Sequence, residues 1–382
     1  MTLPNQAESP VPGETAAGDT RFPKSIGDLH KTITMAQIAK AAGVSQGAIS
    51  SLLNDRDYGI RVSEKTRERV FKVCRELGYI PNDLRAVVRM YPELGDTCLI
   101  ISTRYQGGLA NPFVARLAAA AIGAIGARSR SLTLSFYDDG HDYAADAENL
   151  PHPVRCGVCS KFLCLGEPNP SLLQALHRRG SPCVNLGSDA PHPGVFSLVP
   201  DYVQGSRLAI EHLHRLGHRQ IAIVSGPFGA TDPQIIDLNH GVQLACAEFG
   251  LDLDAQRIVY GDLTEKAGRA ALDELFGRQP EPTAIFCLSD AAAAGVIAAA
   301  HGRGLKVPGQ LSVIGCSDDA CAQFTLPALT TLHLPGEEMG AQGVAEIERL
   351  VREPLLPEPR KLVLPVELTQ RASAGPVKAR EK

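Results

Sequence analysis

Polar residues with small or amide-bearing side chains recur along residues 45–54, at the spacing of one face of a helix. Their hydroxyl and amide groups donate and accept hydrogen bonds with base edges and phosphates, and their size lets a helix enter the major groove. The chemistry indicated by this pattern is DNA recognition. The alternative interpretation is an ordinary helical hairpin with a polar face.

Two other groupings have residue types that bind metals. Cys156 and Cys159 have metal or redox spacing, and Cys164 follows five residues later. Structural zinc takes four ligands, and a second cysteine pair does not stand nearby in the sequence. His212 and His214 point to different sides of a predicted helix. The sequence therefore predicts no metal site, and it contains no cofactor motif.

Catalytic motifs are absent from the sequence. It contains no His-Glu-x-x-His, no phosphate-binding loop ending in Gly-Lys-Ser/Thr, and no Gly-x-Ser-x-Gly. Hydrophobic residues make up 44% and charged residues 21% of the 382, which is typical of a globular protein of two or three domains. The sequence therefore favours a binding protein over an enzyme.

The sequence also bears on the compartment. Apolar runs stay well below the ~18 residues of a membrane span. Residues 1–31 are rich in Pro, Gly, Ser and Thr and lack the basic start and apolar stretch of a secretory signal. We expect a disordered tail there and a cytoplasmic location.

Charge is unevenly distributed along the chain. Residues 30–91 contain eleven Lys and Arg against six Asp and Glu, a net charge of +5. The whole chain has a net charge of −4, so the rest sums to −9. A basic module on an acidic body is typical of nucleic-acid binding, although a solvated basic face gives the same count.

The elements that position the polar face are two short helices. Thr34 and Gln37 form a capping box that begins the first helix, and Gly43 is suited to the left-handed conformation that ends it. Ser45 can cap the second helix. Helices that meet across such a three-residue turn are typical of a helix-turn-helix.

Two further helices follow in the predicted order. Ser63 caps a third helix that ends at Gly78, and Asn82 can cap a fourth, short helix that extends to about Met90. A linker then reaches residue 95.

These residues resemble the lactose-repressor (LacI-type) family of bacterial transcription regulators. The resemblance is carried by the runs from Ile33 to Ser45, from Val62 to Val70 and from Leu77 to Asn82. It implies a reading helix in the major groove, a hinge helix, and a homodimer on a palindromic operator. The helix face and the resemblance together predict DNA contacts by Thr34, Ser45, Gln46, Gly47, Ala48, Ser50, Ser51, Asn54, Tyr79, Asn82, Arg85, Val88 and Arg89.

The chain departs from the family pattern at two of these positions. The leucine that the family wedges into the minor groove is Val88 here, a shorter side chain for unstacking bases. Ser51 stands at a position where the family often has a guanine-reading arginine, so the operator sequence stays open.

From Thr97 onward, short apolar strands alternate with helices, which predicts an α/β body with parallel sheets in two lobes. Ligands of such sheets bind beyond the carboxyl ends of the strands. The predicted strands are Cys98–Ser102, Leu132–Tyr137, Val158–Leu165, Ile221–Ser225, Ala284–Leu288 and Leu311–Gly315. The predicted helices are Phe113–Ala127, Leu172–Arg179, Tyr202–Leu216, Ile235–Phe249, Gly268–Phe276 and Ala291–His301.

The resemblance extends over this body through the segments 201–222, 311–315 and 327–331. It implies the fold of periplasmic sugar-binding proteins and an effector that alters operator affinity by changing the arrangement of the lobes. The predicted domains are a disordered tail (1–31), a helix-turn-helix domain (32–81), a hinge (82–95), an effector-sensing and dimerisation domain (96–371) and a disordered tail (372–382).

The resemblance also implies a set of effector contacts in the cleft between the lobes. The arginine by which the family clamps its effector is replaced by Leu238, which offers neither charge nor donors. The effector is then an unusual sugar or related metabolite, or the response to an effector is lost. A solute-binding protein would account for the predicted two-lobed body but not for the helix-turn-helix domain. Asp201 is expected to cap a helix. The implied effector contacts are Asn111, Phe113, Ser289, Asp290, Ser317 and Asp318.

Overall fold

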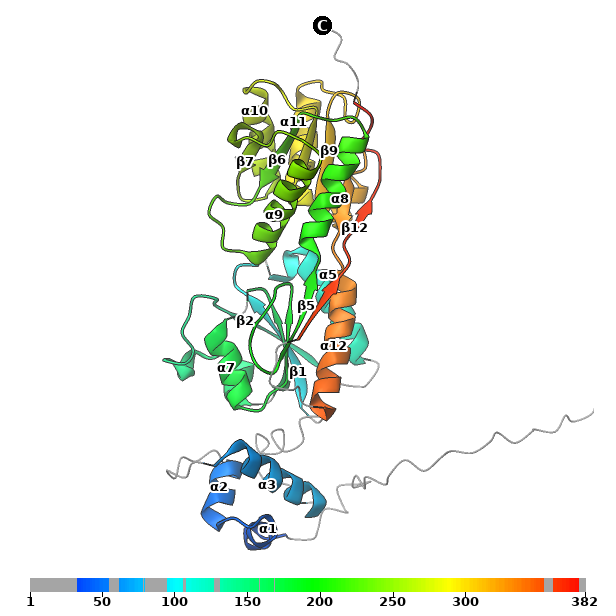
Figure 1. Ribbon diagram of the computed structural model, residues 1–382. Coiled ribbons are helices and arrows are strands. Elements are labelled where there is room, and N and C mark those ends of the chain that lie inside the picture. The colour runs from blue at the N-terminus through cyan, green and yellow to red at the C-terminus, as the bar shows by residue number, and fades with distance from the viewer. Residues whose placement is uncertain are drawn as a thin grey trace, which may run out of the picture. The chain divides into compact units, whose positions relative to one another are not determined.

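The computed structural model describes residues 33–54, 62–77, 79, 95–105, 108–126, 131–157, 159–167, 169–353 and 360–377 (Figure 1). The chain divides into two compact units, Met1–Ala86 and Val87–Lys382, which we call the head and the body. The predicted N-terminal tail and the predicted hinge helix lie outside the described residues.

The described head consists of α1 (Met35–Ala42), α2 (Gln46–Asn54) and α3 (Glu64–Leu77). The capping box is confirmed, since the side chains of Thr34 and Gln37 each accept from the other residue's backbone amide. Gly43 adopts φ 64°, the left-handed conformation expected of it. The Ser45 hydroxyl accepts from the Ala48 amide at 3.2 Å and so begins α2. The helix-turn-helix prediction is therefore confirmed.

The first lobe of the body is a six-stranded parallel sheet in the order β11-β5-β4-β3-β1-β2. Alternate residues of its strands face opposite sides. Leu99 and Ile101 pack with α5 and α12, whereas Cys98 and Ile100 pack with α6 and α7. The elements are β1 (Asp96–Ser102), α5 (Pro112–Gly126), β2 (Leu132–Tyr137), α6 (His152–Cys156), β3 (Cys159–Leu165), α7 (Pro170–Arg178), β4 (Cys183–Leu186), β5 (Val195–Pro200), α12 (Gly336–Arg352) and β11 (Arg360–Leu364).

The second lobe has the strand order β12-β10-β9-β8-β6-β7, in which the edge strand β12 is antiparallel and the other pairs are parallel. Helices α8 and α9 pack on one face of this sheet, and α10 and α11 on the other. The elements are α8 (Tyr202–Arg215), β6 (Ile221–Ser225), α9 (Pro233–Glu248), β7 (Ile258–Tyr260), α10 (Glu265–Phe276), β8 (Ala284–Cys287), α11 (Asp290–Gly302), β9 (Ser312–Ser317), β10 (Thr330–His333) and β12 (Glu367–Thr369). The described part of the body also contains the 3₁₀ turns Gly108–Ala110, Ala147–Asn149, Ala255–Arg257 and Ala320–Gln323.

The chain passes between the lobes three times, after β5, after β10 and between β11 and β12 (Figure 1). Each lobe is therefore assembled from separate stretches of sequence. The predicted α/β body with two sheets is confirmed, and each predicted strand and helix is present within a few residues of its predicted bounds. The short strands β4, β7, β10, β11 and β12, as well as β5, α6 and α12, were not predicted.

The predicted start of a disordered C-terminal tail at residue 372 is wrong. Ser373 is fully buried, and its hydroxyl accepts from the Thr330 amide at 2.8 Å. The Gly375 carbonyl lies 3.0 Å from Nε2 of the buried His218. These small residues belong to the second lobe because they satisfy polar groups that would otherwise be buried without partners. Among the described residues, no helix combines the length and the apolar composition needed to cross a membrane.

Helices α10 and α11 approach each other to backbone contact at two glycines. A Cβ built on Gly295 would lie 2.0 Å from the Glu265 carbonyl oxygen, and one on Gly268 would lie 2.0 Å from that of Ala292. Only glycine permits this spacing.

We predict that Gly295→Ala lowers the free energy of unfolding by about 1–3 kcal/mol or more, because the helices must separate. Gly302→Ala in the same helix is the control, since a Cβ there meets no atom within 4 Å. Urea denaturation of both variants measures the difference. Equal losses in the two variants would contradict the close packing of α10 on α11.

Candidate functional site

The outer side of α2 in the head is polar and uncharged. Ser45, Gln46 and Gly47 are exposed, and Ser50 and Ser51 are half-buried. The sequence of α2 contains no charged residue. The helix therefore offers hydrogen-bonding groups to base edges and no carboxylate that would repel a phosphate.

Other predicted DNA contacts have different surroundings. Ala48 is only 7% exposed and packs inside the head on the side of Leu52, so it supports α2 and does not face outward. Thr34 is exposed, but its hydroxyl belongs to the capping box. Tyr79 is half-buried, and burial raises the pKa of its hydroxyl. The side chain of Asn54, together with Asn82, Arg85, Val88 and Arg89, lies outside the described residues.

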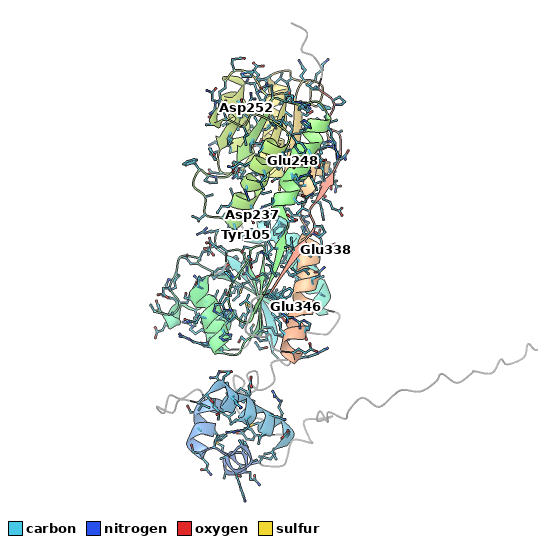
Figure 2. The ribbon with its side chains drawn as sticks, viewed as in Figure 1. Tyr105, Asp237, Glu248, Asp252, Glu338 and Glu346 are labelled. Atoms are coloured by element: carbon cyan, nitrogen blue, oxygen red, sulfur yellow. The ribbon has the colours of Figure 1, made fainter. Side chains whose placement is uncertain are left out.

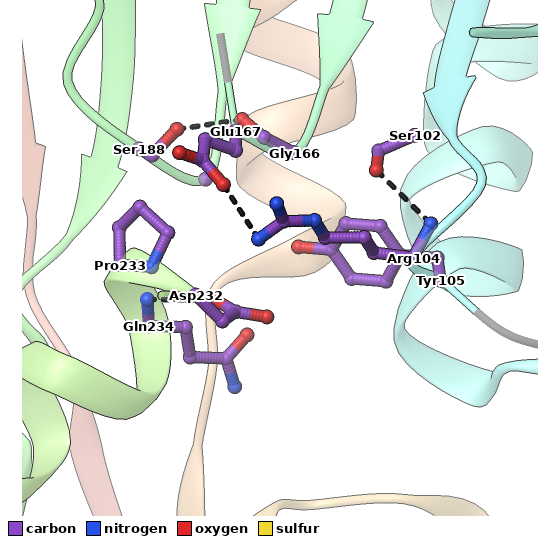
Figure 3. Close-up of a pocket in the computed structure, with 10 residues that line it drawn as sticks. Ser102, Arg104, Tyr105, Gly166, Glu167, Ser188, Asp232, Pro233 and Gln234 are labelled. Carbon is purple, nitrogen blue, oxygen red and sulfur yellow. Dashed lines mark hydrogen bonds and ion pairs between the residues drawn. The ribbon is translucent and has the colours of Figure 1, made fainter. Parts of the chain in front are cut away.

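A pocket lies in the body where the two lobes meet (Figure 3). Its first-lobe side follows the carboxyl ends of β1, β3 and β4, where parallel sheets bind ligands. The start of α9 closes it from the second lobe. In this conformation the cavity has a free volume of about 10 Å³, the space of roughly one water molecule. Lining residues are Ser102, Arg104, Tyr105, Gly166, Glu167, Gly187, Ser188, Asp232, Pro233 and Gln234.

The guanidinium of Arg104 occupies this pocket. Its Nε lies 2.7 Å from Asp139 Oδ2, and its Nη1 lies 2.6 Å from Glu167 Oε2 (Figure 3). The same Nη1 donates to the Thr231 hydroxyl of the second lobe at 2.9 Å. Arg104 therefore links the two lobes across the pocket, and its guanidinium places a positive charge of the protein inside the pocket.

Burial perturbs the ionisable groups around Arg104. Desolvation raises the pKa of Asp139, against the lowering effects of the Ser102 hydroxyl and of Arg104. Desolvation also raises the pKa of the Tyr105 hydroxyl, and Asp232 and Asp139 raise it further. Tyr105 is therefore a neutral hydroxyl that can donate or accept.

A second link between the lobes starts from α5. Arg116 Nη2 donates to the Ser317 carbonyl in the second lobe at 2.5 Å, and Nη1 lies 3.7 Å from Glu337. Ser317 and Asp318 have φ of 124° and 55°, which L-residues rarely adopt. Such strained backbone is common where a loop is held for a function.

Asp290 holds this strained loop in place. It is fully buried, its Oδ2 accepts from the Asp319 amide at 2.7 Å, and its Oδ1 accepts from the Thr331 hydroxyl at 2.5 Å. Burial raises the pKa of Asp290 to about 7, although both hydrogen bonds lower it. Both carboxyl oxygens of Asp290 are therefore engaged in hydrogen bonds within the protein, and the role of this residue is to position the loop.

The other predicted effector contacts are also engaged within the protein. Asn111 accepts from the Phe113 amide at 3.0 Å and caps α5, while Ser289 caps α11. Phe113 is 5% exposed. Asp318 lies 2.6 Å from Arg371; burial raises its pKa, but the hydrogen bonds of Arg371 and His333 outweigh burial and lower it. None of the six predicted contacts is among the ten lining residues, so their role in effector binding stays a prediction.

Sequence reasoning predicted a cleft between the lobes but named none of these ten lining residues. Arg104 and Glu167 each lie two residues beyond the end of a predicted strand, so the carboxyl-end rule was the signal that could have found them. Leu238, at the position of the missing clamp, is fully buried in the core. Asp201 caps α8 by accepting from the Gln204 amide at 2.9 Å, as predicted.

Metal ligation finds no support in the described part of the chain, where no three His, Cys, Asp or Glu side chains are grouped to hold an ion. Cys156 is half-buried and Cys159 is buried. The sulfur of Cys164 lies 3.6 Å from that of Cys183.

Comparison with known proteins assigns both units to described families. Residues 34–82 match the model of bacterial regulatory proteins of the lacI family, and residues 210–374 match that of a periplasmic binding protein-like domain. The chain is 30% identical to the HTH-type transcriptional regulator CelR of Thermobifida fusca, over 89% of this chain and 98% of that protein. It is 28% identical to the ribose operon repressor of Escherichia coli, over 89% and 99%.

Solved structures give the same result. The complex of the transcriptional regulator CelR with cellobiose aligns with a TM-score of 0.64 and 27% identity, over 90% of this chain and all of that one. The lac repressor dimer bound to operator and the anti-inducer ONPF aligns with a TM-score of 0.63 and 24% identity, again over 90% and 100%, which shows the shared fold.

The raised pKa of Asp290 predicts how stability depends on pH. The folded chain holds this proton up to about pH 7, whereas an unfolded aspartate releases it near 3.8. The stabilisation is therefore complete below the unfolded pKa and is lost as the pH rises through the folded pKa. Relative to Asp290→Asn, wild-type unfolding free energy should fall by up to about 1.4 kcal/mol per pH unit between pH 4 and 7.

Urea denaturation at several pH values measures this difference. Asp252→Asn is the control because Asp252 is exposed (Figure 2). A pH-independent difference between wild type and Asp290→Asn would show that the carboxyl is ionised throughout.

Proposed function

The chain belongs to the lacI family of bacterial regulatory proteins, and on this premise we propose that it is a cytoplasmic, dimeric repressor of a palindromic operator. In this proposal it is not an enzyme. Residues 32–81 read DNA, residues 82–95 form the hinge, and residues 96–371 sense an effector and dimerise.

The observation that carries the proposal is the capped helix pair of the head. Ser45 begins α2 at the turn, so the exposed Gln46 and Gly47 stand at the N-terminal end of the helix. The N-terminal residues of a recognition helix are those that contact base edges in the major groove. The net charge of +5 over residues 30–91 supplies attraction to phosphates.

We propose that a small molecule of the sugar class modulates operator affinity from the pocket between the lobes. One solved relative is a complex with cellobiose, and another relative is a ribose operon repressor. A ligand that contacts both lobes stabilises one arrangement of them over another, and that difference is available to change DNA affinity.

A regulator of the same type without a small-molecule response is the second candidate. Leu238 is buried where the family has its clamp, and Arg104 already links the lobes through Thr231. A screen that finds a ligand able to change operator affinity separates the two candidates.

We expect selection from random duplex DNA to enrich a palindrome with the full chain and not with a chain lacking residues 1–95. The physical reason is that a dimer places two α2 helices in successive major grooves. Sequencing of the bound DNA, with binding measured at two salt concentrations, provides the test. A folded dimer that enriches no sequence at modest salt would contradict the proposed function.

We further expect Phe324→Asp with Leu326→Asp to convert the dimer into monomers. These side chains are 80% and 79% exposed and lie two residues apart. Together they form an apolar surface whose exposure to water is unfavourable and which a partner subunit would cover. Phe228→Asp is the control, since Phe228 is 82% exposed on a different loop. Sedimentation velocity reports the mass, and a double variant that stays dimeric refutes this interface.

A further inference from the structure

The pocket between the lobes is acidic. Asp139, Glu167 and Asp232 lie on or beside it, and Arg104 is the one cation among its ten described lining residues. The resulting charge is −2. Neighbouring cations do not cancel it, because Lys361 lies 2.8 Å from Asp189 and Arg116 faces Glu337.

Two acceptors beside the pocket lack a donor. Asp139, whose side chain is 4% exposed, uses Oδ2 for Ser102 and Arg104, while its Oδ1 is buried without a hydrogen bond in the described structure. Asn185, fully buried, donates to Ser188 beside the pocket, and its Oδ1 has no described donor either. Both residues contact residues that line the pocket, Asp139 through Ser102 and Arg104 and Asn185 through Ser188, and buried acceptors without donors favour a ligand that donates.

The other pocket groups suit a small hydroxylated skeleton. The Tyr105 hydroxyl stays neutral, and Ser188 and Gln234 add further polar groups. Gly166 and Gly187, with φ of 122° and 95°, keep the pocket floor free of side chains; a Cβ on Gly166 would lie 2.6 Å from that of Ser102. An ammonium group supplies three donors and a positive charge.

From this geometry we propose that the effector is cationic, a small polyol with a protonated amine such as an amino sugar, which displaces the Arg104 guanidinium from Asp139 and Glu167. This inference rests on the proposed function, since it names the ligand class of the same cleft. A uronate or other anion would meet a net charge of −2, and a neutral sugar would leave the carboxylates and Arg104 paired as they are. Arg104 is thus an internal substitute for the ligand.

The first test fills the space that Arg104→Ala leaves. Methylguanidinium at millimolar concentration should raise the melting temperature of this full-length variant saturably, by about 2–4 °C at ten times its dissociation constant. Sodium chloride at equal ionic strength should not. Arg303→Ala is the matched control, because Arg303 is 40% exposed and pairs with Asp273, against 42% for Arg104. No rise beyond that of salt, or an equal rise in the control, overturns the proposal.

The second test uses the wild-type chain and so does not depend on the variant folding. Hexosamines, neutral hexoses and hexuronates of gluco, galacto and manno configuration are compared by melting temperature. At least one hexosamine should stabilise the chain more than its neutral and acidic counterparts. A panel in which no hexosamine exceeds its neutral counterpart overturns the ligand class.

Operator binding measured on the same samples distinguishes a failure of the cationic-effector proposal from a failure of the proposed function. A chain that binds its operator while no amine binds refutes the cationic effector alone. A chain that binds a hexosamine but enriches no operator refutes the proposed function and leaves the ligand class supported.

Discussion

The buried carboxylate of Asp290 fixes the edge of the second lobe that faces the first. A carboxyl group without exposed surface needs hydrogen-bond partners, and here they are the Thr331 hydroxyl and the Asp319 amide. The Asp319 amide comes directly after Ser317 and Asp318, whose positive φ values each cost about 1–3 kcal/mol. The loop keeps this conformation because the Asp290 bond and the Asp318–Arg371 ion pair over-determine it.

The geometry of this loop then decides how the lobes contact each other. Its strained backbone turns the Ser317 carbonyl toward Arg116 of α5. Gly315 is part of the same arrangement, because a Cβ there would lie 2.2 Å from Asp290 Oδ1. One interlobe link therefore ends on rigid backbone, whereas the Arg104 link ends on the hydroxyl of Thr231. Of the two links, the one through Arg104 is the easier to exchange for a ligand.

Local rules sufficed for the head and failed for the pocket. Capping by Thr34 and Ser45 and the left-handed Gly43 depend only on near neighbours in the sequence, so the helix-turn-helix was predictable. Asp139 reaches Arg104 because β1 pairs with β2 in a register that sets Ser102 opposite Tyr137. That register is a tertiary property, and single residue types do not reveal it.

Burial and helix capping account for structural roles in the body that residue types alone did not reveal. Asn111 and Ser289 have the residue types of ligand contacts, but each satisfies the first amides of a helix. The small residues after 371 have the composition of a tail, yet Ser373 fills a place in the core. Composition predicts what a segment can do in isolation. These roles depend instead on which buried backbone and side-chain polar groups require a hydrogen-bond partner in the folded chain.

If the pocket between the lobes binds the effector as proposed, its internal cation changes the energetics of sensing. While Arg104 binds Asp139 and Glu167, the ligand site is occupied, and the apparent affinity of an effector is reduced by the fraction of chains in which the site is open. Competition between Arg104 and the ligand also makes binding specific. Only a ligand with a positive charge and hydrogen-bond donors can replace the guanidinium beside the carboxylates of Asp139 and Glu167.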